Sequence, residues 1–353
     1  GGKYYRSKST SKQGPGSNLV DADFDYYLNT FPNYTNQSDY KYPNKNIALF
    51  GENIIYISNK LSITPGIRYE NILTRSDGSF KQINLDAAGN VIYNNTTYEK
   101  QSSRRSFFLF GLGVSYKPSK DIEVYSNVSQ NYRSVTFADI SIINPSYAIN
   151  PDISDEKGVT IDLGLRGEIK DLVLLDFTFF NLIYNNRIGF TQKAFKDGSV
   201  KSERGNIGNA SIYGVESNID FDINNLFIKN DNMSLNYFLN TALIDSKYTS
   251  SYVSGVVGKK VEFVPNINLK TGIKFGFSNF VFNVQYSFIS KQFTDSSNAS
   301  EGNISGIIGE IPQYQLLDAS MSYLIRKFKF EAGINNLTNT YYFTRRATGY
   351  PGP

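Results

Sequence analysis

The sequence has 353 residues, of which 40% are hydrophobic and 19% charged, with a formal net charge of +4. It contains no cysteine and no histidine, which excludes disulfides and thiol nucleophiles and removes the commonest general base and metal ligand. We therefore expect no enzyme, no metal site and no cofactor. Lysines and arginines are scattered rather than clustered, so nucleic acid is not an expected partner. No apolar run approaches the roughly 18 residues of a transmembrane helix.

Residues 160–180 (TIDLGLRGEIKDLVLLDFTFF) alternate between apolar and polar side chains, and the alternation resumes after a reversal at Lys170-Asp171. A period of two indicates β-strands, since successive side chains point to opposite faces, and so short a reversal is typical of a hairpin. One face carries leucines and phenylalanines. The other face carries Asp162, Arg166, Glu168 and Asp176.

The same alternation predicts about twelve strands, most of them longer than globular strands and close to the length of tilted membrane strands. Only 44–57 alternates poorly. In chain order the predicted strands lie at 44–57, 61–70, 108–114, 122–128, 161–169, 172–185, 213–221, 233–239, 267–275, 280–288, 317–323 and 328–341.

The connections between these strands are short and long in turn, which is typical of an outer-membrane barrel with short turns on one side and long loops on the other. The short ones lie at 59–60, 118–120, 170–171, 278–279 and 326–327, with a somewhat longer one at 224–232. The long ones lie at 75–103, 134–155, 186–206, 247–261 and 293–311. We therefore predict that the apolar face contacts lipid and the polar face a water-filled lumen. A soluble β-protein with the apolar face buried is the alternative.

Within the first long connection, residues 76–100 contain two turn signals, Asp77-Gly78 and Ala88-Gly89-Asn90, separated by short strand-like pieces. Such a pattern predicts a β-hairpin that stands above the membrane.

Three stretches resemble the barrel of TonB-dependent outer-membrane receptors. The chain ends in FEAGINNLTNTYYFTRRATGYPGP, where Gly333, Asn335, Asn336, Leu337, Asn339 and Tyr342 match the family pattern of a late barrel strand. NIGNASIYGVES (206–217) and VYSNVSQNYRSVTFADI (124–140) are similar to two earlier strands of the family. TRRATGYPGP looks like the ferric-citrate type of siderophore receptor.

This resemblance implies an all-β fold, a transmembrane antiparallel β-barrel, of which the chain would supply about strands 9–21 of 22. Residues 1–43 would form a strand end and an extracellular loop, 44–341 the strand meander, and 342–353 another extracellular loop. The family's plug domain, its TonB-contacting segment and the last strand are not found in the sequence. The implied location is the outer membrane of a Gram-negative cell, with lipid and lipopolysaccharide around the barrel.

The resemblance also implies active uptake of an iron chelate, ferric citrate or another carboxylate siderophore, driven by TonB through the plug region. Anionic chelates require arginine or lysine as charge-assisted donors, with glutamine for orientation. By their position in this family, loops 134–155 and 186–206 are expected to close over the ligand. The candidate ligand-binding residues are Arg133, Arg187, Gln192, Arg204, Arg345 and Arg346, and further loop cations are Lys193 and Lys196.

Several alternatives remain at this point. Each of these cations is also explained by solvation or by pairing with lipopolysaccharide phosphates. Gly189 and Gly205 are either hinges for loop closure or ordinary turn glycines. Asp152, Asp155 and Glu156 lack the spacing of a calcium loop and are interpreted as solvated acids. An importer of carbohydrate with the same fold, and a soluble β-rich adhesin, are the rival functions.

Overall fold

The structure is a computed structural model that describes residues 1–16, 30–34, 36–136, 139, 147–195, 198, 200–302, 306 and 308–346, except the side chains of Asn36 and Tyr147. Lys196 and the tail 347–353 lie outside the described residues, as does most of 137–146. The elements are β1 (Gly2–Gln13), β2 (Asn36–Glu52), β3 (Ile55–Tyr56), β4 (Leu61–Leu85), β5 (Val91–Tyr116), β6 (Ile122–Arg133), β7 (Tyr147–Ile149), β8 (Glu156–Ile169), β9 (Val173–Ala194), β10 (Val200–Asp222), the π-helix η1 (Asn224–Ile228), β11 (Met233–Ser251), β12 (Ile267–Phe277), β13 (Phe280–Ile289), β14 (Gln292–Phe293), β15 (Glu310–Ile311), β16 (Tyr314–Ile325) and β17 (Phe328–Ile334).

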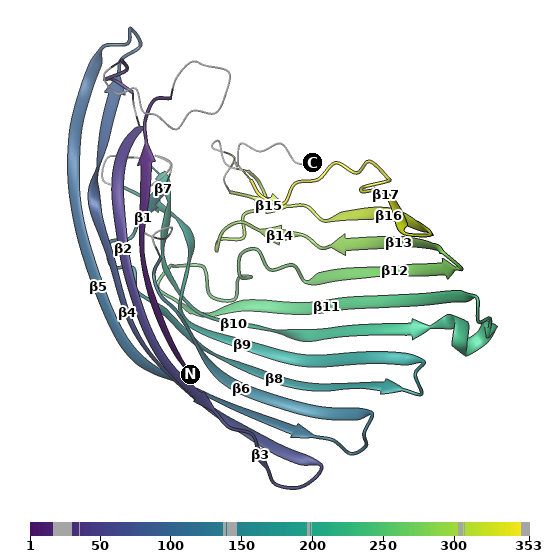
Figure 1. The fold of residues 1–353 in the computed structure, drawn as a ribbon. Coiled ribbons are helices and arrows are strands. Elements are labelled where there is room, and N and C mark those ends of the chain that lie inside the picture. Colours follow the sequence, from purple (N-terminus) through teal and green to yellow (C-terminus); the bar gives the residue numbers. More distant parts are fainter. Residues whose placement is uncertain are drawn as a thin grey trace. The chain divides into compact units, whose positions relative to one another are not determined.

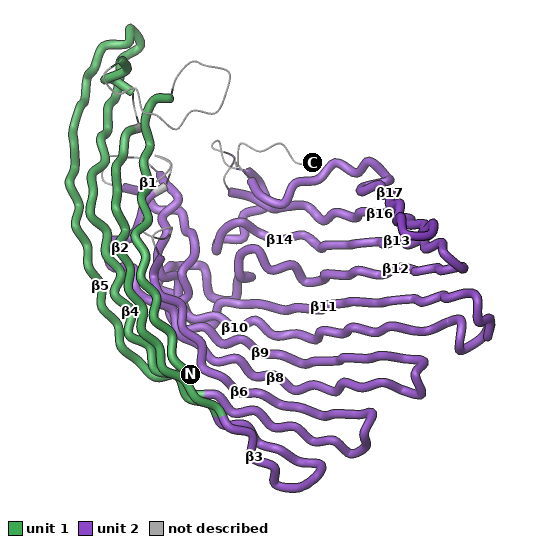
Figure 2. The backbone as a smooth tube through the Cα atoms, in the orientation of Figure 1, with its two compact units in different colours: residues 1–52, 66–110 green, residues 53–65, 111–353 purple. Residues whose placement is uncertain are grey.

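The chain divides into two compact units, which Figure 2 colours separately. Unit 1 comprises residues 1–52 and 66–110, and unit 2 comprises 53–65 and 111–353. In unit 1, β1 pairs antiparallel with β2, and β2 pairs antiparallel with β4. These pairings satisfy the backbone polar groups of long strands without any contribution from a packed core.

A turn at 86–90 joins β4 to β5, with Gly89 at φ +85° and the Asp86 amide donating to the Asn90 carbonyl at 2.9 Å. The hairpin predicted at 76–100 is therefore present, with its turn at the second signal. The turn predicted at the first signal, Asp77-Gly78, is wrong, because both residues lie inside β4. A Cβ atom at Gly78 would come within 2.3 Å of the Asp39 carbonyl oxygen, so glycine serves a close approach of strands there.

In unit 2 the strands follow one another across the sheet in the order β6-β8-β9-β10-β11-β12-β13-β16-β17, each antiparallel to its neighbours. Figure 1 shows them side by side. The end of β5 pairs with β6. The predicted antiparallel meander is thus confirmed. It has one exception, since β7 pairs with β10 in parallel.

The short connections have the backbone geometry of tight hairpin turns. Lys170 and Asp171 have φ values of +53° and +56°, and Ser278 and Arg326 also lie in the left-handed region. Such turns match the twist of antiparallel strands. The reversals predicted at 170–171, 278–279 and 326–327 are found at these positions.

The long connections differ from the prediction, because strands continue through two of them. β4 and β5 run through most of 75–103, and β9 and β10 cover most of 186–206. Sequence alternation fades there, although the hydrogen-bond ladder continues, since a ladder requires only backbone groups. At the other end of the chain, β17 stops at Ile334 rather than near 341. Asn336 and Asn339 then adopt φ values of +53° and +52°.

The two faces of the sheet in unit 2 carry different side chains. Leu163, Phe177 and Phe179 are 53%, 49% and 42% exposed. On the opposite face Arg166 pairs with Glu123 at 3.0 Å. A two-sheet sandwich would bury the apolar rows. Their exposure is what lipid contact requires. Among the described residues, no helix has the length and apolar character needed to cross a membrane.

A small core lies where β9, β10 and β11 meet the segment after β11. Its buried members are Phe180, Ile207, Ala210, Ile212, Tyr248, Val256 and Val261. This cluster fixes Tyr248 and the segment that ends at Glu262, and both belong to the site described below.

We predict that Phe179→Lys lowers the free energy of unfolding of the protein in lipid bilayers by about 2–4 kcal/mol, because a charge on the apolar face must leave water. Glu216→Lys, on the opposite face of the neighbouring strand, is the matched control and should change it by less than about 1 kcal/mol. Denaturant titration in liposomes measures both. Equal losses would contradict the assignment of the faces.

Candidate functional site

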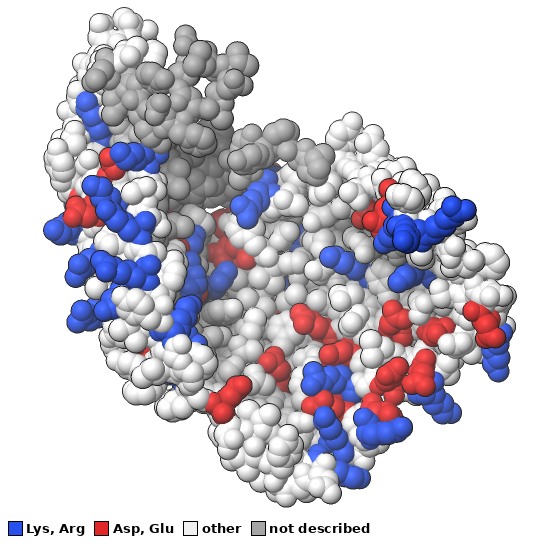
Figure 3. Space-filling view, in the orientation of Figure 1, with Lys and Arg blue, Asp and Glu red and all other residues white. Residues whose placement is uncertain are grey.

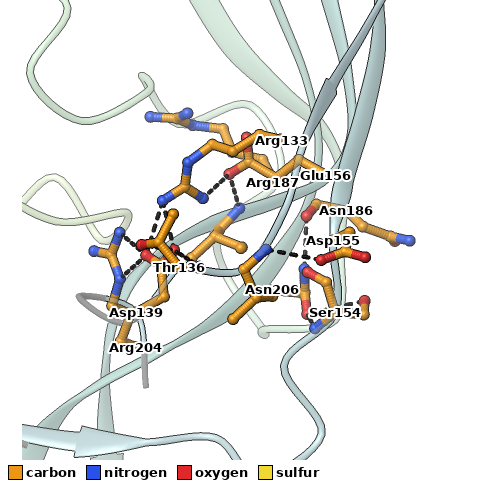
Figure 4. Close-up of polar contacts among 12 residues, drawn as sticks. Arg133, Thr136, Asp139, Ser154, Asp155, Glu156, Asn186, Arg187, Arg204 and Asn206 are labelled. Atoms are coloured by element: carbon orange, nitrogen blue, oxygen red, sulfur yellow. Dashed lines mark hydrogen bonds and ion pairs between the residues drawn. The ribbon is translucent and has the colours of Figure 1, made fainter. Parts of the chain in front are cut away.

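At the end of unit 2 that carries the long connections, two arginines converge on one buried carboxylate (Figure 4). Arg133, the last residue of β6, donates from Nη2 to both oxygens of Asp139 at 2.8 Å. Arg204 of β10 donates from Nε to Asp139 Oδ1 at 2.6 Å. Thr136 adds its amide and its hydroxyl at 2.9 and 2.8 Å. Asp139 is fully buried, so this arrangement fixes the start of the loop that follows β6.

A second buried carboxylate, Glu156 at the start of β8, ties three strands together. It accepts hydrogen bonds from Arg133 Nη1 at 3.2 Å and from the Ile188 amide of β9 at 2.6 Å. Asp155 accepts from the Val135 amide at 2.7 Å and from the Tyr132 hydroxyl. The interpretation of these two acids as solvated is therefore wrong. Both organise the ends of the strands.

The far end of the same loop is fastened to β10. The Asn150 amide donates to the Arg204 carbonyl at 2.9 Å. Asn206 Oδ1 accepts a hydrogen bond from the Ser154 amide at 2.7 Å. Asn206 Nδ2 donates to the Ser154 and Asn186 carbonyls at 2.9 and 2.6 Å. Together with the parallel pairing of β7, these bonds hold the described ends of 134–155 against β10.

The third buried carboxylate, Glu262, faces Arg187. Arg187 follows Asn186, whose φ of +55° accompanies a register shift between β9 and β10. Its Nη2 lies 3.5 Å from Glu262 Oε2, and its guanidinium lies over the Tyr184 ring at 5.7 Å. The Tyr248 hydroxyl approaches the two Glu262 oxygens at 3.0 and 2.8 Å. Arg187 Nε is buried and has no hydrogen-bond partner among the described residues.

The surroundings shift the pKa values of Glu262 and Asp139 in opposite directions. Burial raises the pKa of Glu262, and this outweighs the Arg187 charge and the Tyr248 hydrogen bond that favour ionisation. Burial also tends to raise the pKa of Asp139. The hydrogen bonds from Thr136 and the charge of Arg204 outweigh it and lower the pKa. Asp139 is therefore a permanent anion at neutral pH, whereas Glu262 is easier to protonate.

These groups surround a cavity of about 450 Å³. It is lined by Asn131, Tyr132, Arg133, Glu156, Lys157, Tyr184, Arg187, Ile188, Gly189, Phe190, Arg204, Glu262 and Phe263. The lining has four cations, two carboxylates and the nearby Asp139 behind two of the arginines. One positive charge is in excess, and a second is added when Glu262 is protonated. The cavity is thus suited to an anion.

The structure brings together three of the six predicted ligand-binding residues, Arg133, Arg187 and Arg204. The other three do not line the cavity: Gln192 and Arg345 are exposed, and Arg346 donates from Nε to the Glu310 carbonyl at 2.9 Å. Lys193 is paired with Glu203 at 2.6 Å. Whether any of these residues contacts a ligand stays a prediction.

Gly189 and Gly205 lie inside strands rather than in turns, and a hinge role for them stays a prediction. They lie opposite each other in β9 and β10. A Cβ atom at Gly189 would lie 2.6 Å from Glu262 Oε1, and one at Gly205 would lie 2.8 Å from Asn150 Cβ. Their missing side chains allow the carboxylate and the returning loop to approach the sheet.

Sequence reasoning missed Asp139 and Glu262, the carboxylates that orient the arginines. Each stands between two apolar neighbours, in FADI and KVEF, and Arg204 lies 65 residues along the chain from Asp139. An isolated acid between apolar residues is a weak sign of a buried, paired carboxylate. Among the described residues, no group of three or more potential ligands surrounds a metal position.

Comparison with known proteins yields a family match and solved structures of similar fold. The family model described as "TonB dependent receptor-like, beta-barrel" matches residues 2–337. The ferric yersiniabactin uptake receptor FyuA from Yersinia pestis is similar at 17% identity and a TM-score of 0.66, over 88% of this chain and 43% of that one.

Two further structures are similar over nearly the whole chain. The ferric citrate transporter FecA gives 17% identity and a TM-score of 0.66, over 97% of this chain and 54% of that one. The ferric-catecholate import receptor Fiu from E. coli K12, in its closed form, gives 14% identity and a TM-score of 0.68, over 99% of this chain and 50% of that one. At these identities the likeness shows the fold. The chain spans about half the length of each of these proteins.

We predict that Asp139→Asn destabilises the protein at pH 7 by up to about 3 kcal/mol, because two partly exposed arginines lose the buried carboxylate that both of them contact. The lowered pKa of Asp139 means that this stabilisation is present above the ordinary carboxyl pKa of about 4 and is lost only as the pH falls through the lower folded value. Melting temperatures of wild type and variant should therefore differ at pH 7 and converge toward pH 2. A constant difference across this range would contradict the role of the Asp139 charge.

Proposed function

Because the chain belongs to the TonB-dependent receptor-like β-barrel family, we propose that it serves in TonB-dependent uptake of an anionic iron chelate across the outer membrane of a Gram-negative cell. Proteins of this family are outer-membrane transport receptors rather than enzymes. TonB would act through the receptor's plug region, and the iron would be cargo rather than a cofactor. Ferric citrate or another carboxylate siderophore is the cargo class that the residues favour.

The observation that carries this proposal is the state of Arg187. It lines the cavity, its partner Glu262 is 3.5 Å away, and its Nε–H is buried without an acceptor among the described residues. A buried donor without a partner costs free energy. A carboxylate that enters the cavity would satisfy this donor and gain a charge-assisted bond.

Arg133 and Arg204 play a different part in this proposal. Their donors are largely occupied by Asp139 and Glu156, so they supply positive potential rather than free hydrogen bonds. Iron itself would stay inside its chelate, since the described residues include no group of three or more side chains placed to bind a metal ion. Recognition would then act on the carboxylates at the surface of the chelate.

A carbohydrate cargo requires aromatic rings with open faces. Tyr132, Tyr184, Phe190 and Phe263 do line the cavity. However, guanidinium groups lie over two of these rings, Arg187 over Tyr184 at 5.7 Å and Arg204 over Phe190 at 4.7 Å. An arginine-covered ring favours an anion over a neutral sugar, so the chelate remains the better proposal.

The test is equilibrium binding of ferric citrate to the full-length receptor at physiological salt. Arg187→Ala should weaken binding roughly ten- to a hundred-fold, as expected for one lost charge-assisted contact of about 1.5–3 kcal/mol. Lys120→Ala, an equal change of charge at an exposed position in a short connection outside the cavity lining, is the matched control and should stay within about twofold.

The variant Glu262→Gln tests whether Arg187 contacts the ligand or serves only as the structural partner of Glu262. If Arg187 serves the ligand, removing its competitor should preserve or strengthen ferric citrate binding. If the Arg187→Ala variant binds ferric citrate within about twofold of the wild-type affinity, Arg187 does not contact the ligand. Binding of a neutral oligosaccharide without any binding of ferric citrate would establish the carbohydrate alternative.

A further inference from the structure

One face of unit 1 changes from apolar to basic along all four of its long strands. Tyr4 precedes Arg6 on β1, and on β2 Lys45 lies just beyond Ile47. The apolar residues of this face form what we call the apolar row: Tyr4, Ile47, Leu49, Tyr69 and Phe108. In this row Tyr4 is opposite Ile47, Leu49 is opposite Tyr69, and the Tyr69 and Phe108 rings lie 5.1 Å apart. Strand alternation places the row and the cations on the same face.

The cations lie next to one another across the strands. Arg6 is opposite Lys45, and Lys45 is opposite Leu73, two residues before Arg75. On β5, Arg104 lies two residues beyond Ser106, which receives a hydrogen bond from Asn71 at 2.7 Å. We define the basic patch as Arg6, Lys8, Lys45, Arg75 and Arg104. Figure 3 shows lysine and arginine gathered over unit 1.

The basic patch contains a shallow cavity of about 510 Å³. Its lining includes four of the five cations and no carboxylate: Tyr4, Arg6, Ser7, Lys8, Pro43, Asn44, Lys45, Leu73 and Arg75. All five patch cations are exposed. None of them forms an ion pair within the part of the chain that the structure describes.

The nearest acids on this face already have cations of their own. Asp39 pairs with Lys12 at 3.0 Å, and Asp77 with Lys100 at 3.7 Å. Both lie farther along the strands, away from the apolar row. The patch therefore has five uncompensated positive charges directly beside a surface suited to acyl chains. This differs from the cavity of unit 2, where carboxylates balance most of the charge.

We infer that the basic patch binds the phosphate groups of an anionic glycolipid, lipopolysaccharide, in the outer leaflet, while the apolar row contacts its acyl chains. This inference rests on the outer-membrane location in the proposed function. The short connections lie at the opposite ends of β4 and β5, so the patch is on the side of the long extracellular connections. A lipid with phosphates above several acyl chains matches both charge and apolar contact.

The test uses the full-length receptor in neutral detergent, titrated with bisphosphorylated lipid A and followed by native mass spectrometry. Each basic residue near a lipid surface contributes roughly a fivefold change in affinity. The triple variant Arg6→Gln, Lys45→Gln, Arg75→Gln should therefore bind roughly a hundredfold more weakly. Dephosphorylated lipid A should bind wild type and triple variant equally weakly.

The matched control is Lys117→Gln, Lys120→Gln, Lys327→Gln, which removes the same charge from exposed positions at the short connections. It should bind lipid A within about threefold of wild type. Equal affinity of wild type and the patch variant would overturn the inference, as would full displacement of the lipid by inorganic pyrophosphate at equal concentration, which would indicate a free-anion site.

Ferric citrate binding by the same variants keeps the two proposals separate. The patch variant should retain wild-type affinity for ferric citrate, which also shows that it is folded. Loss of lipid A binding with ferric citrate binding intact supports the basic patch. A receptor that binds lipid A through the patch but never binds ferric citrate would overturn the proposed cargo and leave the patch in place.

Discussion

The hydrogen-bond ladder between antiparallel strands is the constraint on which the rest of this structure depends. In hydrocarbon, every unpaired backbone N–H or C=O costs several kcal/mol, so a chain with an apolar outer surface must pair its strands continuously. The ladders of β8 to β13 meet this requirement without a conventional core. The faces of the sheet are then free to differ, with Phe177 and Phe179 on one side and Arg166 and Asp176 on the other.

The same ladder supports the candidate site, because β9 and β10 continue beyond the apolar rows. A ladder that extends into water supplies a rigid frame on which polar side chains can be buried. Glu156 accepts an amide of β9, and Asn206 of β10 holds the loop after β6. The buried carboxylates Asp139 and Glu262 are tolerated only because arginines from other strands compensate them. Register shifts near Asn206 and Gly208 direct Arg187 into the cavity.

The two basic regions differ in a way that suggests different partners. In unit 2, Arg133 and Arg204 are held by carboxylates, so the cavity has a small net charge and fixed geometry. Such a site selects by the placement of a few donors. In unit 1, the cations of the basic patch are exposed and lack acidic neighbours. A surface of that kind attracts a multiply charged partner through potential, with strong dependence on salt.

The sequence alone determined the strand alternation, the hairpin reversals such as Lys170-Asp171 and the family resemblance, because each is encoded within about twenty neighbouring residues. It also identified Arg133, Arg187 and Arg204 among six candidates, from their positions in or beside the long connections. Only the tertiary structure decided that these three meet around one cavity and that Gln192 and Arg345 do not. It alone showed that Asp139, distant in sequence from Arg204, is its partner. Strand length was misjudged where the ladder continued through polar residues, since backbone pairing leaves no apolar pattern in the sequence.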